Sequence, residues 1–284
     1  MPLKLLYITN NPKIAKIAED NGVDRIMVDM EYIGKDKRQG GIDSVKNHHT
    51  EEDICTIRKA VKKAQLVVRV NPIHEAGEGY CSSEEEIDGA VRCGADVLML
   101  PYFKTAAEVR RFLNCVNGRC HTILLLETRD AVEALDEILE IPGVEEIHIG
   151  LNDLSISYGR SFLFELLTDG TVERICWRIR KSGIPYGFGG IASLGRGDVP
   201  AEMIIREHYR IGSTGVILSR SFCNVNKIDN LEAAEEIFFR GVREIRTLER
   251  ECAAYRDYFE KNRGELKEAV AKVVNRIKAG HTLS

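Results

Sequence analysis

The sequence predicts an α/β protein of the (β/α)8 TIM-barrel class with an extended C-terminal helical segment. Short apolar runs alternate with amphipathic segments, the runs number eight, and no Gly-x-Gly-x-x-Gly turn follows the first of them. Alternating strands and helices give a parallel sheet covered by helices, and eight repeats favour a closed barrel over an open doubly wound sheet. A chain of 284 residues with 44% hydrophobic composition suits a single domain over residues 1–284.

Each apolar run is rich in aliphatic and β-branched residues, as buried parallel strands are. In chain order the runs cover residues 3–8, 25–31, 66–71, 97–102, 122–128, 146–152, 185–191 and 214–220. Polar residues gather at the C-terminal ends of several runs, where a barrel carries its chemistry. A strand end also simply begins a solvated loop, so a single polar residue there is weaker support than the set.

Beyond the eighth run the chain continues with a helical apolar stripe over residues 230–280 that exceeds what barrel closure needs. We expect C-terminal helices there that take part in oligomer packing. The alternative is an antiparallel hairpin folded back on its own barrel.

Composition excludes several classes of protein. The formal net charge of −4 is mixed along the chain, which argues against binding to nucleic acid. The N-terminal apolar run is too short for a signal peptide, and no 18 consecutive apolar residues occur, so we expect a cytoplasmic protein without membrane binding. Eight scattered cysteines without a CxxC pair indicate core thiols in a reducing compartment rather than a zinc site.

Two carboxylates follow consecutive predicted strands. Glu127 lies near the end of the run 122–128, within LLLET, and Asp153 directly follows the run 146–152, within HIGLND. Two hard oxygen ligands that leave other positions open suit Mg²⁺ or Mn²⁺ better than zinc. The alternative is a pair of acids that cap loops.

Arg69 and Gly150 are candidates for binding an anionic substrate. Arg69 follows a strand of the buried type, where an unpaired guanidinium is costly, so it must meet an anion. That anion is either a ligand or a carboxylate on the neighbouring strand, from Asp29 or Glu31. Gly150 leaves the following backbone amides unshielded beside Asp153, a geometry that receives a carboxylate oxygen.

At these positions the chain resembles the HpcH/HpaI aldolase and citrate lyase beta-subunit family. The motifs that carry the resemblance are VDME (28–31), VVRVNP (67–72), GADVLMLPYFKTAAEV (94–109), LLLET (124–128) and IGLNDLS (149–155). The FGGIA stretch extends the match to residue 192, and the 26-residue interval between Glu127 and Asp153 is similar to the family's spacing of metal ligands.

The resemblance implies a role for each matching residue. It makes Glu127 and Asp153 the ligands of a divalent cation and Arg69 the residue that binds the keto or enolate oxygen. It places the substrate carboxylate at the amides that follow Gly150, which are those of Leu151 and Asn152. The acidic pair Asp29 and Glu31 matches the family pair that holds water at the cation and supplies a base.

The chain departs from the family pattern at two places. Pyruvate aldolases have a histidine after the acidic pair, where this chain has Tyr32, and acyl-CoA members have Pro-Lys where this chain has Pro101–Tyr102. The loop of residues 34–53 is longer than an ordinary βα connection, and such loops are often functional. His49, or His48, could replace the missing base from this loop; a surface histidine pair is the alternative.

Together these residues predict a class II aldolase, that is, a metal-dependent carbon–carbon lyase that makes or breaks a bond to a pyruvate-like 2-oxo acid enolate, with an aldehyde as second substrate. One alternative is an acyl-CoA lyase that binds CoA phosphates at Lys35, Lys37 and Arg38. Another is a protein that binds a 2-oxo acid without catalysis, because the family histidine is absent.

Overall fold

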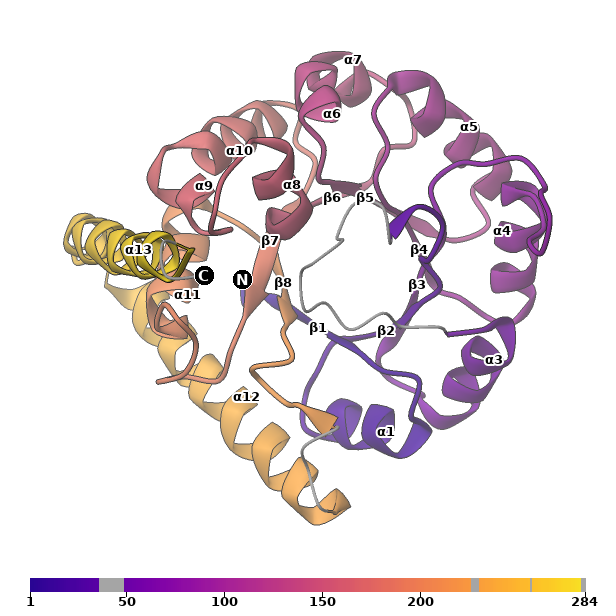
Figure 1. Ribbon diagram of the computed structural model, residues 1–284. Coiled ribbons are helices and arrows are strands. Elements are labelled where there is room, and N and C mark those ends of the chain that lie inside the picture. The colour runs from indigo at the N-terminus through magenta and orange to yellow at the C-terminus, as the bar shows by residue number, and fades with distance from the viewer. Residues whose placement is uncertain (36–48, 226–229, 256, 282–284) are drawn as a thin grey trace. The chain divides into compact units, whose positions relative to one another are not determined.

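The computed structural model describes residues 1–35, 49–225, 230–255 and 257–281. Its strands follow the order β1 to β8 and close into a barrel, which confirms the predicted (β/α)8 class (Figure 1). The strands are β1 (Lys4–Ile8), β2 (Arg25–Asp29), β3 (Gln65–Arg69), β4 (Val97–Leu100), β5 (His121–Leu126), β6 (Glu146–Ile149), β7 (Tyr186–Ile191) and β8 (Gly215–Leu218).

Each predicted apolar run contains one strand, but most strands end earlier than the run does. β2 ends at Asp29 and β6 ends at Ile149, so the polar residues that follow belong to the first turn of the next segment. The described helices are α1 (Pro12–Asp20), α3 (Glu51–Ala60), α4 (Ser83–Arg92), α5 (Ala106–Val116), α6 (Arg129–Glu133), α7 (Leu135–Leu139), α8 (Leu151–Ser157), α9 (Glu165–Thr168), α10 (Thr171–Lys181), α11 (Ala201–Ile211), α12 (Leu231–Ala254) and α13 (Phe259–His281).

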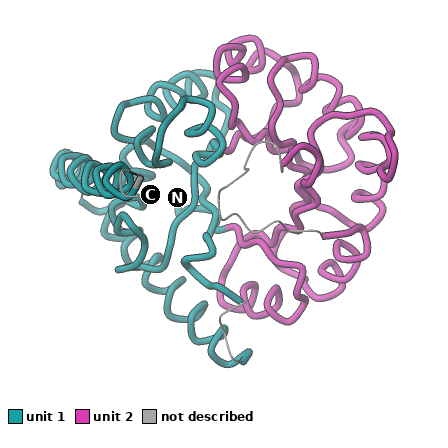
Figure 2. The backbone as a smooth tube through the Cα atoms, in the orientation of Figure 1, with its two compact units in different colours: residues 1–5, 149–284 teal, residues 6–148 magenta. Residues whose placement is uncertain are grey.

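The chain divides into two compact units, residues 6–148 and residues 1–5 with 149–284 (Figure 2). We call them unit 2 and unit 1, as in the figure, and describe each by itself. The expected single domain over the whole chain stays a prediction.

Unit 2 is built on four consecutive parallel strands, β2 to β5, with α1, α3, α4 and α5 packed outside them (Figure 1). The strand side chains at its centre, such as Val67 and Leu98, are fully buried. Its helices begin where the sequence offers side-chain caps. Thr50, Ser82 and Thr105 each form a capping box at the start of α3, α4 and α5. These caps set the points at which the strand-to-helix loops end.

Unit 1 contains β7, β8 and the two long C-terminal helices. Both α12 and α13 pack against α11 of the same chain (Figure 1). This packing accounts for part of the apolar stripe predicted over residues 230–280. α12 buries Phe238, Val242 and Ile245, whereas α13 buries Leu266 and Val270. The two helices therefore lie on their own chain, and their expected use in an oligomer stays a prediction.

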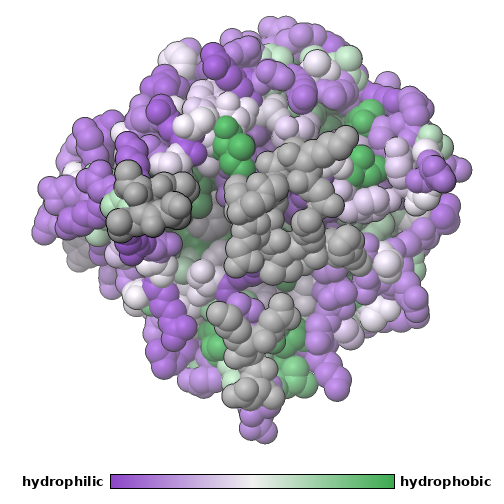
Figure 3. All heavy atoms as spheres, in the orientation of Figure 1, coloured by the Kyte–Doolittle hydropathy of each residue, from purple (hydrophilic) through white to green (hydrophobic). Residues whose placement is uncertain are grey.

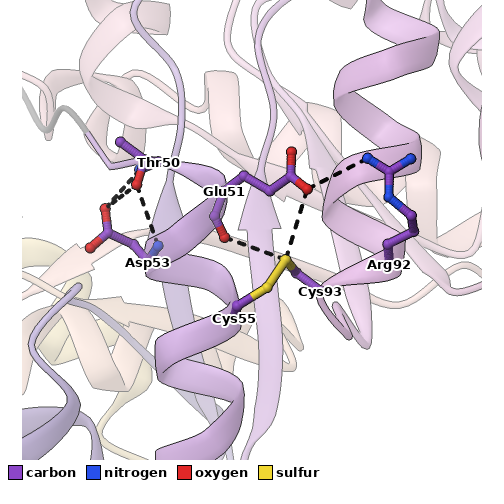
Figure 4. Close-up of a disulfide and its surroundings, with 6 residues drawn as sticks. All are labelled: Thr50, Glu51, Asp53, Cys55, Arg92 and Cys93. Carbon is purple, nitrogen blue, oxygen red and sulfur yellow. Dashed lines mark hydrogen bonds and ion pairs between the residues drawn. A yellow bond between two sulfur atoms is a disulfide. The ribbon is translucent and has the colours of Figure 1, made fainter.

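The cysteines depart from the expected set of buried thiols. Cys55 on α3 and Cys93 at the end of α4 form a disulfide with a Cα–Cα distance of 4.7 Å (Figure 4). Of the described cysteines that remain, Cys176, Cys223 and Cys252 are buried, whereas the others are partly or fully exposed. The spacing of 38 residues between the bonded pair carries no sequence signal, because the packing of α3 on α4 brings the pair together.

Most of the surface seen in Figure 3 is hydrophilic, with apolar residues in small separate patches. Among the helices of the described residues, none combines the length and the apolar character that crossing a bilayer requires.

Candidate active site

The acidic pair that follows β2 is ion-paired to Arg69. Arg69 Nε and Nη2 donate to the two carboxylate oxygens of Asp29, both at 2.7 Å, and Nη1 lies 3.5 Å from Glu31 Oε2. The parallel register of β2 and β3 places Asp29 directly opposite Arg69. Burial alone would lower the pKa of Arg69, but the two carboxylates outweigh it and raise that pKa above its usual range. Of the two anions that the sequence suggested for Arg69, the carboxylates of Asp29 and Glu31 on the neighbouring strand are therefore present.

This ion pair leaves part of the guanidinium available for a ligand. Two of the five N–H donors of Arg69 are used on Asp29, and the Glu31 contact of Nη1 is long. The Arg69 side chain is 15% exposed, whereas that of Asp29 is 1% exposed. The guanidinium is thus held in one orientation while Nη1 keeps donors for an anionic oxygen.

Lys35 adds a second cation to this cluster. Its Nζ lies 3.3 Å from Asp29 Oδ2 and 3.5 Å from Glu31 Oε2, and its side chain is only 9% exposed. The four side chains therefore balance in charge, which offsets the cost of burying each of them. The assignment of Lys35 to a surface patch for CoA phosphates is corrected, because its ammonium faces the buried acids.

Two further positions of that predicted patch, Lys37 and Arg38, lie outside the described residues, and so does His48. His49 is described, and it reaches the acidic pair. Its Nδ1 accepts a hydrogen bond of 2.9 Å from the backbone N–H of Asp29. Because a backbone N–H only donates, the neutral imidazole carries its proton on Nε2. Burial lowers the pKa of His49, although the carboxylates of Asp29 and Asp53 oppose this shift, so the neutral form prevails near pH 7.

Glu127 directly follows β5, and its carboxylate accepts a hydrogen bond from a residue with an unusual backbone conformation. The Tyr102 N–H donates to Glu127 Oε1 at 3.0 Å, and Tyr102 has a φ of 49°, in the left-handed region that few non-glycine residues adopt. Glu127 is 4% exposed, and its charge contributes to the raised pKa of Arg69. The strain at Tyr102 therefore accompanies a fixed orientation of this carboxylate. Within unit 2 the Glu127 carboxylate therefore acts electrostatically on Arg69, the residue that is ion-paired to the acidic pair.

Asn71 organises the turn that carries Glu31. Its Oδ1 accepts the backbone N–H groups of Tyr32 and Ile33, both at 2.9 Å, and its Nδ2 donates to Met30 O at 3.1 Å. Asn71 was quoted within the VVRVNP motif, but the sequence alone did not reveal this positioning role.

Behind Asn71, the buried carboxylate of Glu86 accepts from Asn71 Nδ2 at 2.8 Å, and burial raises the pKa of Glu86. Tyr32, which occupies the position of the family histidine, is 43% exposed. Burial of its phenol and the nearby Glu86 carboxylate raise the pKa of Tyr32.

The other predicted ligands begin α8 in unit 1. Asp153 is 8% exposed and accepts from Asn152 Nδ2 at 3.2 Å. Gly150 is the N-cap residue of α8 and offers no side-chain cap, so the first amides of the helix, those of Leu151 and Asn152, receive no side-chain oxygen from it. Leu151 packs on Gly189, where a Cβ would lie 2.7 Å from Leu151 Cδ1. The glycine-rich run after residue 186 begins within strand β7.

The donor set fits a hard divalent cation. Glu127 and Asp153 are buried carboxylates, and each accepts a hydrogen bond, from the Tyr102 N–H and from Asn152 Nδ2 respectively. Carboxylate oxygens are the ligands that Mg²⁺ and Mn²⁺ prefer. Among the described residues, no group of three or more histidine, cysteine or acidic side chains is arranged as a metal site. The predicted pair has only two carboxylates, so this finding does not test it. Each carboxylate is described within its own unit, so their use by one cation stays a prediction.

A family model described as HpcH/HpaI aldolase/citrate lyase matches residues 4–163. A hydroxypyruvate/pyruvate aldolase from Roseovarius nubinhibens is 23% identical over 190 residues, which are 62% of this chain and 73% of that protein. The solved structure of an HpcH/HpaI aldolase from Desulfitobacterium hafniense aligns with a TM-score of 0.58 and 17% identity, over 86% of this chain and 93% of its own. That of a citrate synthase aligns with a TM-score of 0.59 and 16% identity, over 83% and 94%. At these identities the structural likenesses bear on the fold alone.

Proposed function

The chain belongs to the HpcH/HpaI aldolase/citrate lyase family, and from this premise we propose that it is a divalent-metal-dependent carbon–carbon lyase of the aldolase type. Its substrate would be a 4-hydroxy-2-oxo acid, cleaved to pyruvate or another 2-oxo acid and an aldehyde. One observation supports this more than any other. The guanidinium of Arg69 is fixed by two hydrogen bonds to Asp29, and its Nη1 keeps donors for an anionic ligand.

Glu127 and Asp153 would hold the cation. When bound, Mg²⁺ or Mn²⁺ would supply positive charge that stabilises an enolate. Arg69 would contribute Nη1 to the same developing negative charge, already oriented by Asp29. The first amides of α8, from Leu151 onward, would receive the substrate carboxylate.

The remaining chemistry is movement of a proton. In the cleavage direction the C3–C4 bond breaks, its electron pair forms the enolate of the 2-oxo acid, and the C4 hydroxyl proton passes to a base. We assign that base to Glu31, because its contacts with Lys35 and Arg69 are both long, at 3.5 Å, whereas two bonds of 2.7 Å hold Asp29 on Arg69. The protonated Glu31 would then return this proton to C3 of the enolate, which completes the 2-oxo acid and restores the Glu31 carboxylate.

His49 would act as a hydrogen-bond donor. Its Nδ1 is occupied by the Asp29 N–H, so it offers a proton at Nε2 rather than a lone pair. A neutral histidine in this state is suited to donate to a carbonyl or alkoxide oxygen of the substrate. Accepting a proton at Nδ1 would first require losing the bond to the Asp29 amide.

The experiment is an assay of pyruvate release from a panel of 4-hydroxy-2-oxo acids with Mg²⁺, with Mn²⁺ and with a chelator. We expect activity that the chelator abolishes and a metal restores, and Glu127→Gln should lower kcat/KM by at least about 1,000-fold. The matched control is Glu108→Gln, a change at the capping box of α5 that should leave kcat/KM unchanged.

Two alternatives to the proposed aldolase would each give a different result. Stabilisation by Mg²⁺ and pyruvate without turnover of any substrate would identify a binding protein that does not catalyse. Retention of the chain on CoA-agarose, with cleavage of an acyl-CoA, would identify the acyl-CoA lyase.

A further inference from the structure

Two exposed tyrosines lie in the loops that follow β2 and β3. Tyr32 comes directly after Glu31 and is 43% exposed, and Tyr80, in the loop between β3 and α4, is 37% exposed. Because β2 and β3 are parallel neighbours, both loops leave the same edge of the sheet. The two tyrosines therefore belong to the end of unit 2 that carries Glu31 and Arg69.

The backbone at Tyr32 is fixed to the start of the loop that carries Tyr80. Asn71 Oδ1 accepts the N–H of Tyr32 at 2.9 Å, and the Glu86 carboxylate accepts from both the N–H and the Nδ2 of Asn71. Burial is the largest cause of the raised pKa of Tyr32, and the charges of Glu86 and Tyr80 are among those that add to it. The two loops are thus joined where they begin, and Tyr80 lies within electrostatic reach of Tyr32.

The ring of Tyr80 is held in place by its own loop. Gly77 and Tyr80 exchange two backbone hydrogen bonds, and a Cβ added to Gly77 would lie 2.4 Å from Tyr80 Cζ, so the ring occupies space that a glycine leaves open. The ring meets that of His74 edge to face, with 5.5 Å between the ring centres. The two nitrogens of His74 lie 2.7 Å from Pro72 O and 2.9 Å from Cys81 O. A ring fixed in this way loses little conformational entropy when a ligand binds.

The charges around Tyr80 disfavour an anionic ligand. Residues 70–91 contain six acidic side chains and neither lysine nor arginine. Arg111 of α5 reaches this loop, but it is paired with Glu75 at 2.6 Å and with Glu84 at 3.1 Å. A carboxylate or phosphate bound beside Tyr80 would therefore meet like charges, whereas a neutral ring would not.

We propose that Tyr32 and Tyr80 bind the substituent of the aldehyde and that this substituent is a neutral aromatic ring. This inference rests on the proposed aldolase function. In that reaction C4 carries both the hydroxyl whose proton passes to Glu31 and the substituent of the aldehyde. The substituent therefore leaves the reacting carbon beside Glu31, which Tyr32 follows in the chain. A contact between two aromatic rings adds about 2- to 10-fold to binding beyond the apolar area that it buries.

The test measures aldol addition of pyruvate to three aldehydes with Mg²⁺ or Mn²⁺, on the full-length chain. Phenylacetaldehyde and cyclohexylacetaldehyde share the same reacting group and a ring of similar size, but only the first ring is aromatic; propanal has no ring. We expect kcat/KM for phenylacetaldehyde to exceed that for cyclohexylacetaldehyde at least about 5-fold. Tyr80→Ala and Tyr32→Ala should each lower the phenylacetaldehyde value at least about 10-fold, mainly through KM, and change the propanal value less than about 2-fold. Tyr80→Phe should keep the preference, because the ring remains.

The matched control is Tyr255→Ala, which removes an exposed tyrosine at the C-terminal end of α12 and should leave all three values unchanged. Exchange of the C3 protons of pyruvate into D2O involves no aldehyde, so Tyr32→Ala and Tyr80→Ala should keep the wild-type exchange rate. Equal kcat/KM for the two ring aldehydes in a chain that exchanges these protons would overturn this inference alone. So would an equal loss with all three aldehydes in Tyr80→Ala. A wild-type chain without metal-dependent exchange would overturn the proposed function, and this inference with it.

Discussion

Removing the carboxylate of Asp29 should destabilise the protein strongly, because Asp29 joins both cations of the buried cluster. The change Asp29→Asn keeps the shape of the side chain but leaves Arg69 and Lys35 with one carboxylate, Glu31, between them. Breaking a buried ion pair from one side costs about 3–5 kcal/mol. Since Arg69 is 15% exposed and water screens part of its charge, we expect the lower end, about 3 kcal/mol.

The assay is urea unfolding followed by far-UV circular dichroism, on Asp29→Asn, Arg69→Gln and the double variant. The two single changes should not add, and the interaction energy from this cycle should be at least about 1.5 kcal/mol. The matched control is Asp20→Asn, which removes an exposed pair with Lys16 of similar length, 2.6 Å. An exposed pair of this kind contributes at most about 1 kcal/mol. Equal losses for Asp29→Asn and Asp20→Asn, or additive single changes, would refute the reasoning.

Three further outcomes are expected. The Glu19 carboxylate accepts the backbone N–H groups of residues 62–64 at 2.5 to 2.9 Å, which overcome the effect of burial and hold its pKa at about 2 against an ordinary 4.5. It therefore contributes roughly 3 kcal/mol of stability above pH 4.5 that is lost as the pH falls toward 2, and Glu19→Gln should flatten acid unfolding in that window; an unchanged profile would contradict this. Reducing the Cys55–Cys93 disulfide, which spans 38 residues, should lower the free energy of unfolding by roughly 4 kcal/mol in the chain-entropy model. The measurement is denaturation with and without reductant. Equal free energies of unfolding would mean that the disulfide does not constrain the unfolded chain as that model requires. In the cleavage assay His49→Gln, which keeps an N–H donor, should retain more kcat/KM than His49→Ala, whose loss should be about 100-fold or more; equal losses would argue against a donor role.

The strands and the barrel could be predicted because each buried strand leaves a run of apolar residues, and eight such runs with helices between them suit few architectures. The pairing of Arg69 with Asp29 could be considered for a similar reason, since consecutive strands of a barrel are neighbours in the sheet. What remained open was the choice between that pairing and a ligand, because the sequence does not show how many donors of a guanidinium are used.

Other features depend on contacts that no local pattern records. Lys35 looks like a solvated lysine in a charged loop, and only the turn after β2 directs its ammonium toward the acidic pair. The hydrogen bond that fixes the His49 tautomer joins residues 20 positions apart through a loop of unusual length. The disulfide depends on the packing of α3 against α4, and the left-handed backbone of Tyr102 breaks the ordinary preference of a tyrosine. Such departures from local preference are commonest where a site imposes its own geometry.

The most direct test of the proposed lyase is exchange of the C3 protons of pyruvate into D2O, followed by proton NMR, because it requires no knowledge of the aldehyde. With Mg²⁺ or Mn²⁺ the wild-type chain should exchange these protons well above the rate in buffer. Glu127→Gln, Asp153→Asn and a chelator should each return the rate to that of buffer. Exchange that persists in both variants, or a wild-type chain that gives none with either metal, would contradict the proposal of a metal-dependent enolate site at these residues.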